Sequence, residues 1–202
     1  MANKDHSLDQ RIIDAARAEF LEHGFRKASL HKIADRAELT TGALYTRYKN
    51  KDTLFCSLVA PALREIGEHM GPVEGLYRKA QEERSAEALL EAIRTEERIY
   101  LDLLYQHYEA CVLLFCKSGG TSLEAGMNRL MEEKTRQTVE FFRSIAVREI
   151  DFDGIELLMS EQFCYYRQLL LRGYDKEKAV SCMSTVELFL EAGWKSLFDR
   201  LL

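Results

Sequence analysis

Residues that interrupt helices are scarce in this chain, and their scarcity limits what it can fold into. Only 2 prolines and 11 glycines occur among 202 residues, whereas a fold of many short strands needs frequent turn residues. Between these breaks, apolar residues recur at intervals of three and four, as in Ile12, Ala16 and Phe20. The sequence therefore predicts an all-α protein.

Short helices are predicted at the start of the chain, over 8–23, 30–37 and 41–48, with a further helix from Lys51. Gly24 suits the left-handed residue that ends a helix. Ser29, Thr40 or Thr41, and Asn50 precede the later helices and are typical N-caps, because their side-chain oxygens accept free backbone N–H groups.

The helix from Lys51 is predicted to kink at Pro61 or break near Ala60, since proline removes a backbone donor. Gly71-Pro72 and Gly75 are predicted to end it. Further helices are predicted over 85–104, with an apolar continuation to 117, and then over 121–147, 153–172 and 175–201.

Positive charge is concentrated in one segment although the whole chain is acidic. The formal net charge is -5, yet residues 26–51 hold 7 basic and 2 acidic side chains. A localised basic patch indicates contact with a polyanion such as nucleic acid. A solvated charged surface is the alternative interpretation.

The cysteines and the N-terminal residues indicate the cellular compartment in which we expect the protein. The 5 cysteines include no C-x-x-C pair and lie in apolar contexts, which favours free buried thiols and argues against a zinc site. Residues 1–8 are polar, unlike a signal peptide, and no apolar run has the roughly 18 residues that span a bilayer. We expect a cytoplasmic protein without a membrane segment, cofactor or metal.

The segment from Ala28 to Leu54 has the spacing of a helix-turn-helix: a short capped helix, a turn over 37–40, and a second short helix from Thr41. Small residues at its start, Thr41, Gly42 and Ala43, allow close approach to base edges in the major groove. The free N–H groups at that end suit a phosphate.

This segment resembles the TetR/AcrR family of transcriptional regulators. The resemblance covers about the first 55 residues, and the matching stretches are Ile12–Ala16, Phe20–Phe25, Ser29–Ala34, Ala37–Tyr48 and Lys49–Leu54. It implies a DNA-binding domain over 1–54 and a helical ligand-binding and dimerisation domain over 55–202. It also implies a ligand-responsive regulator, in most cases a repressor, that binds a palindromic operator as a homodimer.

The resemblance also implies roles for single residues. Ser29 caps its helix and contacts a phosphate, and Thr41 and Gly42 meet bases beside Thr40. The Tyr45 hydroxyl contacts a phosphate next to Thr46 or Arg47, although Tyr45 packing into the domain is the alternative. Lys51 holds a phosphate, with a merely solvated lysine as the alternative.

The sequence departs from the family's pattern at two places. Glu38 stands where the family usually has glycine, so a left-handed backbone there carries a strain of about 1–2 kcal/mol. Arg47-Tyr48 replaces a usual histidine-phenylalanine pair, and Arg47 has the donors to read a guanine or to add phosphate affinity.

The remaining helices are rich in aromatic residues that either fill a core or line a mainly apolar pocket. The candidate pocket residues are Tyr100, Tyr105, His107, Tyr108, Phe115, Phe163 and Tyr166. Such a pocket suits a small hydrophobic or aromatic ligand.

The last two predicted helices carry more apolar residues than one domain needs to bury, which favours a homodimer through these helices over a monomer with a full core. The residues in question are Phe163, Tyr166, Leu170, Phe189, Leu190 and Trp194.

An enzyme and a helical adaptor are the other classes of function to consider for such a chain. Catalytic motifs such as H-E-x-x-H, G-x-S-x-G or a glycine-rich phosphate loop are absent from the sequence, which argues against an enzyme. A helical adaptor with lost or weak DNA binding is the alternative to a regulator, and Glu38 is the residue that favours it.

Overall fold

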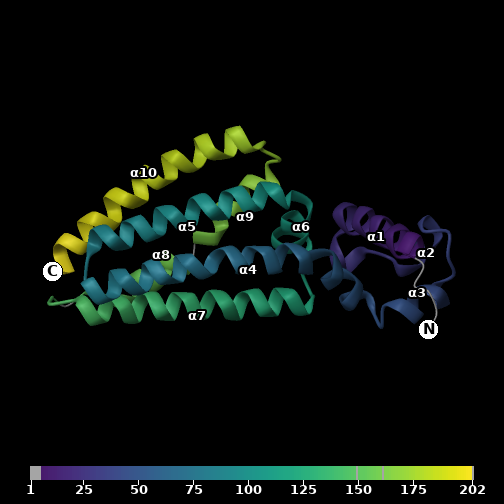
Figure 1. Ribbon diagram of the computed structural model, residues 1–202, viewed down its shortest axis with the longest axis horizontal. Coiled ribbons are helices and arrows are strands. Elements are labelled where there is room, and N and C mark those ends of the chain that lie inside the picture. Colours follow the sequence, from purple (N-terminus) through teal and green to yellow (C-terminus); the bar gives the residue numbers. More distant parts are fainter. Residues whose placement is uncertain (1–5, 149, 161, 202) are drawn as a thin grey trace. The chain divides into compact units, whose positions relative to one another are not determined.

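The computed structural model describes residues 6–148, 150–160 and 162–201, and every regular element in these ranges is a helix (Figure 1). The all-α prediction is confirmed. The elements are α1 (His6–Lys27), α2 (Leu30–Arg36), α3 (Thr41–Arg47), α4 (Lys51–Glu83), α5 (Ala86–Gln106), α6 (Tyr108–Val112), a π-helical turn η1 (Leu113–Lys117), α7 (Ser122–Ile145), α8 (Phe152–Ser160), α9 (Gln162–Leu171) and α10 (Lys176–Leu201).

The helices form two compact units. An N-terminal unit comprises residues up to 64 together with 107–127, and a C-terminal unit comprises 65–106 and 128–202. Both α4 and α7 contribute residues to each unit. The functional boundary predicted at residue 54 stays a prediction.

The core of the N-terminal unit gathers fully buried side chains from α1, α2, α3 and α4. Phe20 and Phe55 meet edge to face, with ring centroids 5.0 Å apart, and Leu113 and Leu114 of η1 join them. The predicted core residue Leu44 belongs to this cluster, and Tyr48 packs against it.

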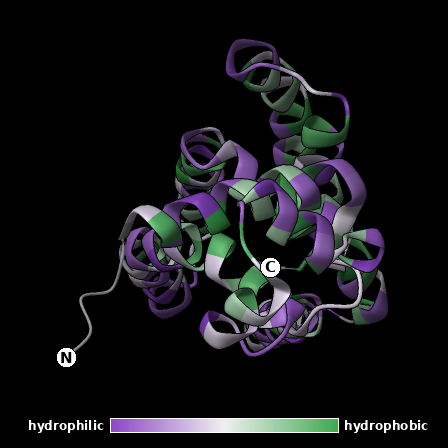
Figure 2. Cartoon of the chain, turned by 90° about the vertical axis from the view of Figure 1, so that its right-hand side faces the viewer, coloured by the Kyte–Doolittle hydropathy of each residue, from purple (hydrophilic) through white to green (hydrophobic). Residues whose placement is uncertain are grey.

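The core of the C-terminal unit is also aromatic. The Phe142 ring of α7 lies 5.1 Å from the Phe198 ring of α10 and 5.5 Å from Trp194, measured between centroids. Leu89 of α5 and Ile155 of α8 are buried in the same cluster. In Figure 2 the helices carry green, hydrophobic residues and purple, hydrophilic residues on different sides, as amphipathic helices do.

Most helix ends lie where side-chain chemistry predicts them. Gly24 has φ 70 inside α1, so the helix is interrupted there as predicted, although the next residues resume helical geometry to Lys27. Thr121 accepts the Glu124 N–H at the start of α7, and Asp175 accepts the Lys178 N–H at the start of α10. Gly173, with φ 63, follows the end of α9.

Three predicted boundaries are wrong. Helix α4 continues through Pro61 and past Gly71, Pro72 and Gly75 to Glu83, with buried residues throughout: Ala62, Ile66, Val73 and Ala80. The apolar continuation after α5 is interrupted at His107, whose ψ is 39, before α6. The helix predicted over 153–172 is two helices, α8 and α9.

No helix in the described ranges has an apolar stretch long enough to cross a bilayer.

Candidate nucleic-acid interface

Helices α2 and α3 are held on the N-terminal unit by one buried face each. Ile33 and Ala34 of α2 and Leu44 of α3 are at most 1% exposed. The Glu38 and Leu39 N–H groups bond to carbonyl groups of α2, which shapes the turn between the helices. The helix-turn-helix that the spacing predicts is therefore present.

Side-chain caps fix where these two helices begin. The Ser29 hydroxyl accepts the Lys32 N–H at 3.4 Å, and the Thr40 hydroxyl accepts the Ala43 N–H at 3.1 Å. The Ser29 N–H in turn donates to the carboxylate of Glu19, which is 2% exposed. The predicted caps are confirmed, and α1 positions the start of α2 through Glu19.

The opposite face of α3 is open. Tyr45 is 53% exposed, which contradicts the alternative that it packs into the domain, and Gly42 and Thr46 are exposed beside it. Thr41 is half-buried. The Thr46 hydroxyl donates to the Gly42 carbonyl oxygen at 2.9 Å. While this bond is kept, the hydroxyl can only accept a hydrogen bond from a ligand. Side chains of α3 thus meet solvent over the turn that contains Gly42 and Tyr45.

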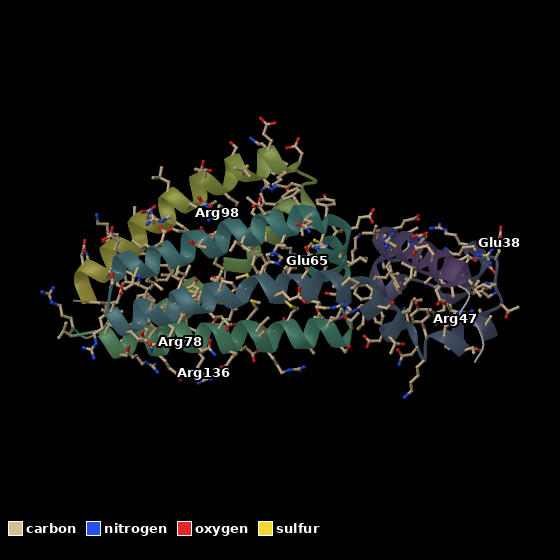
Figure 3. All side chains as sticks on the ribbon, viewed as in Figure 1. Glu38, Arg47, Glu65, Arg78, Arg98 and Arg136 are labelled. Carbon is tan, nitrogen blue, oxygen red and sulfur yellow. The ribbon has the colours of Figure 1, made fainter. Side chains whose placement is uncertain are left out.

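Arg47, labelled in Figure 3, is bound within the unit. Its guanidinium donates to the Asp9 carboxylate of α1 at 2.8 Å, and both side chains are about one quarter exposed. Because the pair joins residues 38 apart in sequence, it fastens the end of α3 to the start of α1. The predicted contact of Arg47 with DNA requires this pair to open or to share its donors.

Lys51 is likewise engaged. Its ammonium group donates to the carbonyl oxygens of Arg26 and Ala28, at 3.3 and 3.0 Å, and lies 4.7 Å from the Phe25 ring centroid. These contacts cap carbonyl groups at the end of α1, where a cation is favourable. One of the three ammonium protons is left over for a phosphate, so the predicted phosphate contact stays a prediction.

Glu38 adopts the left-handed backbone that the sequence predicts, with φ 56. Its carboxylate forms an ion pair with Arg11 of α1 at 3.1 Å, in which the Glu38 side chain is 80% exposed. The negative charge in the turn is thus accompanied by a positive one that sequence reasoning missed.

The comparisons with known proteins agree on this region. A family model described as bacterial regulatory proteins of the tetR family matches residues 12–58. The N-terminal helix-turn-helix is thus similar to that of the tetR family. A probable acrEF/envCD operon repressor of Escherichia coli is 45% identical over 64 residues, which cover 30% of this chain and 29% of that protein.

An HTH-type transcriptional repressor of Mycobacterium tuberculosis is 34% identical over 79 residues, 37% of this chain and 40% of that protein. The matches thus span less than half the length of these relatives. The fold similarity is broader: a TetR-like transcriptional regulator from Rhodococcus has a TM-score of 0.62 at 19% identity, over 92% of this chain and 96% of that one. The TetR-like fold therefore extends across both units.

The structure divides the predicted pocket residues between the two units. Tyr100, Tyr105 and Tyr166 belong to the C-terminal unit, whereas His107, Tyr108 and Phe115 belong to the N-terminal unit. The side chain of Phe163 lies outside the described residues.

Within the C-terminal unit, the rings of Tyr100 and Tyr166 lie 5.2 Å apart, and Tyr166 is 4% exposed. The Tyr105 hydroxyl donates to the Tyr174 carbonyl oxygen at 2.8 Å. In the N-terminal unit, Phe115 packs against the core cluster around Phe20 and Phe55.

Sequence reasoning missed one buried acidic residue of the C-terminal unit. Glu97 of α5 is only 4% exposed, and burial, followed by the charges of Glu187 and Glu96, raises the pKa of its carboxyl to about 7. The sequence carried a signal, because Glu97 lies four residues after Ile93 and four before Leu101 in an otherwise apolar stripe.

Proposed function

We propose that this chain is a transcriptional repressor that binds operator DNA as a homodimer and is released by a small hydrophobic effector. The observation that carries the proposal is the open face of α3, where Tyr45 and Gly42 are exposed on a helix that Leu44 anchors in the core. Helix-turn-helix proteins insert this second helix into the major groove. The repressor names of the relatives from Escherichia coli and Mycobacterium tuberculosis support the same role.

Charge supports DNA as the partner. Residues 26–51 combine 7 basic with 2 acidic side chains, and of these acidic residues Glu38 is paired with Arg11 and Asp35 with His31. A basic segment of this kind gains affinity by displacing counterions from phosphates. Binding is therefore expected to weaken steeply as salt increases.

The exposed apolar residues of α8 and α10 support a homodimer through the last helices. Leu157 of α8 is 70% exposed, and Leu188 and Phe189 of α10 are 73% and 77% exposed. Apolar side chains this exposed are favourable when a second copy covers them. Tyr166 and Leu170, which the sequence assigned to the interface, are instead buried within the protomer, because α9 turns them into its own unit.

A two-fold dimer accounts for a palindromic operator. Two copies of α3 reach successive major grooves when they lie about 34–36 Å apart on one DNA face. An effector releases DNA when it binds better to a dimer geometry that misses this spacing. The aromatic residues of the C-terminal unit, including Tyr100 and Tyr166, suit a hydrophobic effector.

The adaptor alternative rested on the negative charge of Glu38. Since Arg11 lies 3.1 Å from that carboxylate, the charge that opposes DNA binding is partly offset, and we favour the repressor. No observation in the described residues favours an enzyme. With no membrane-spanning helix in the described ranges and DNA as its partner, we expect the protein to act in the cytoplasm.

The test is selection from a randomised duplex pool, followed by fluorescence anisotropy with the enriched operator at two salt concentrations. Tyr45→Phe removes one exposed hydroxyl from α3 and is expected to weaken binding about fivefold, the value of about one hydrogen bond. Tyr48→Phe is the matched control, because Tyr48 packs against the core. Failure of any duplex to enrich, with a folded dimer, would reject DNA binding.

The dimer is tested separately by analytical ultracentrifugation of Phe189→Asp, which places a charge on the exposed part of α10. Conversion to monomer is expected. A dimer of undiminished stability would show that this part of α10 is not the interface.

A further inference from the structure

The open face of α3 carries few of the side chains that read bases through paired hydrogen bonds. Arginine and lysine bind guanine in this way, and asparagine and glutamine bind adenine. Arg47 is the one residue of these four types in α3, and its guanidinium donates to the Asp9 carboxylate at 2.8 Å. The exposed side chains of α3 are instead those of Tyr45 and Thr46, beside the backbone of Gly42.

The polar part of Thr46 is occupied by the helix itself. Its hydroxyl donates to the Gly42 carbonyl oxygen at 2.9 Å, and a hydroxyl has only one proton to donate. A hydroxyl bonded to the backbone of the preceding turn also restricts rotation about χ1, so the methyl group on the other branch of the Cβ has a defined position. Thr46 therefore presents a methyl group, and no hydrogen-bond donor, on an exposed side chain.

Gly42 leaves room beside this methyl group. It lies four residues before Thr46, and residues at this spacing are neighbours on one side of a helix. Apart from the adjoining residues and the backbone of α3, the nearest atom to a Cβ at Gly42 would be the Thr40 Oγ1, at 3.8 Å. A flat group from outside the protein can thus approach the backbone at Gly42 and contact Thr46 at the same time.

We propose that α3 reads thymine in the operator through its 5-methyl group, with the Thr46 methyl as the apolar contact and Gly42 as the space that admits the base edge. Thymine is the base with a methyl group in the major groove, and threonine methyl groups contact it there. Guanine presents only acceptors at that edge, which the occupied Thr46 hydroxyl does not satisfy. The inference rests on the proposed function and specifies the chemistry of the operator.

The experiment removes one methyl group at a time from the DNA. In the operator enriched from the randomised pool, each thymine of one half-site is replaced in turn by deoxyuridine, which lacks only the 5-methyl group. Binding of the full chain is measured by fluorescence anisotropy. At the thymine that Thr46 contacts, the affinity should fall about fourfold, the contribution of one buried methyl-sized group. The salt dependence should stay the same, because no phosphate contact is lost.

Two variants of Thr46 separate its methyl group from its hydroxyl. Thr46→Ser keeps the hydroxyl that binds the Gly42 carbonyl and removes the methyl, so it should bind the thymine and deoxyuridine operators equally. Thr46→Val keeps the methyl and should retain the difference of about fourfold. Thr138→Ser is the matched control, because the Thr138 hydroxyl also donates to a carbonyl four residues earlier, that of Lys134 in the C-terminal unit.

Gly42→Ala tests the space beside Thr46. A Cβ at this position meets no close contact within the protein, so circular dichroism should show an unchanged fold. The added methyl group occupies the place of the base edge, and both the affinity for the operator and the difference between thymine and deoxyuridine should decrease. Undiminished affinity and an undiminished difference would overturn the role of Gly42.

Three results would overturn the methyl contact. The first is an operator that tolerates deoxyuridine at every thymine, and the second is a methyl effect of equal size in wild type and Thr46→Ser. The third is weaker binding by Thr46→Val to an operator that is insensitive to deoxyuridine, which would assign the contact to the hydroxyl and to a donor on adenine or cytosine.

The same measurements keep the two proposals apart. An operator that binds with a steep salt dependence but is insensitive to deoxyuridine supports the repressor function and rejects thymine reading by Thr46. Failure of any duplex to enrich rejects both proposals, because one methyl contact of about fourfold is too small to abolish binding by itself.

Discussion

Replacing Glu38 by glycine tests how much backbone strain the turn of the helix-turn-helix contains. Glu38 has φ 56, a conformation that costs a residue with a Cβ about 1–2 kcal/mol and costs glycine nothing. Against this gain, glycine loses about 0.5–1 kcal/mol more chain entropy on folding. The Arg11 ion pair is also lost, but it is exposed and contributes little.

Glu38→Ala is the comparison that isolates the strain, because it also removes the ion pair and keeps the Cβ. Subtracting the two variants leaves the strain minus the entropy term, so we expect Glu38→Gly to be more stable than Glu38→Ala by about 1 kcal/mol. Urea unfolding followed by circular dichroism measures this difference, with equal m-values as the condition for comparing midpoints.

Arg84, with φ 47 between α4 and α5, provides an independent repeat. Arg84→Gly should likewise exceed Arg84→Ala in stability, for the same backbone reason. If the alanine variants equal or exceed the glycine variants at both positions, the strain argument is refuted.

Three further outcomes are expected. Thr40→Ala removes the cap on the Ala43 N–H and should lower the free energy of unfolding by about 1 kcal/mol, while Thr40→Ser retains it; equal unfolding midpoints for all three proteins would dismiss the cap. Asp9→Asn removes the ion pair that holds Arg47. If Arg47 then contacts a phosphate, a plot of the logarithm of the operator-binding constant against the logarithm of the salt concentration should become steeper by about 0.9. An unchanged slope would mean that Arg47 does not reach DNA. Because burial raises the pKa of Glu97 to about 7, its protonated form favours folding, and this contribution to stability is present in acid and is lost as pH rises toward 7. Glu97→Gln lacks this loss, so its free energy of unfolding relative to wild type should rise between pH 5 and pH 8 in urea unfolding. A difference that is independent of pH would contradict the raised pKa.

The helix-turn-helix was predictable because its determinants are local. Ser29 and Thr40 cap the N-termini of α2 and α3 by accepting N–H groups three residues along the chain. The left-handed backbone at Glu38 was expected from the resemblance, because the family usually has glycine there. Contacts between distant residues were not predictable in this way. Nothing near Arg47 in sequence indicates Asp9, and the packing of α1 against α3 decides that they meet.

The predicted end of α4 was wrong for a different reason. A proline inside a helix costs about 3 kcal/mol, and the sequence-based prediction gave that cost full weight at Pro61 and Pro72. Ala62, Ile66 and Val73 nevertheless continue one apolar stripe past both prolines, and all three are buried. Burial of that stripe outweighs the lost hydrogen bonds, and only tertiary packing reveals it.

Helix α4 has a consequence for how the molecule deforms. Resistance of a helix to bending comes from its ladder of backbone hydrogen bonds, and Pro61 and Pro72 each remove one rung. Gly67, Gly71 and Gly75 lie in the same stretch, with no atom of another part of the chain within 4 Å of where a Cβ would stand. Residues 61–75 are therefore the part of α4 that bends most easily. The backbone amides of this part should exchange with deuterium faster than those of residues 51–60. A thermal fluctuation will bend α4 there before it unseats Leu54 or Phe55 from the core.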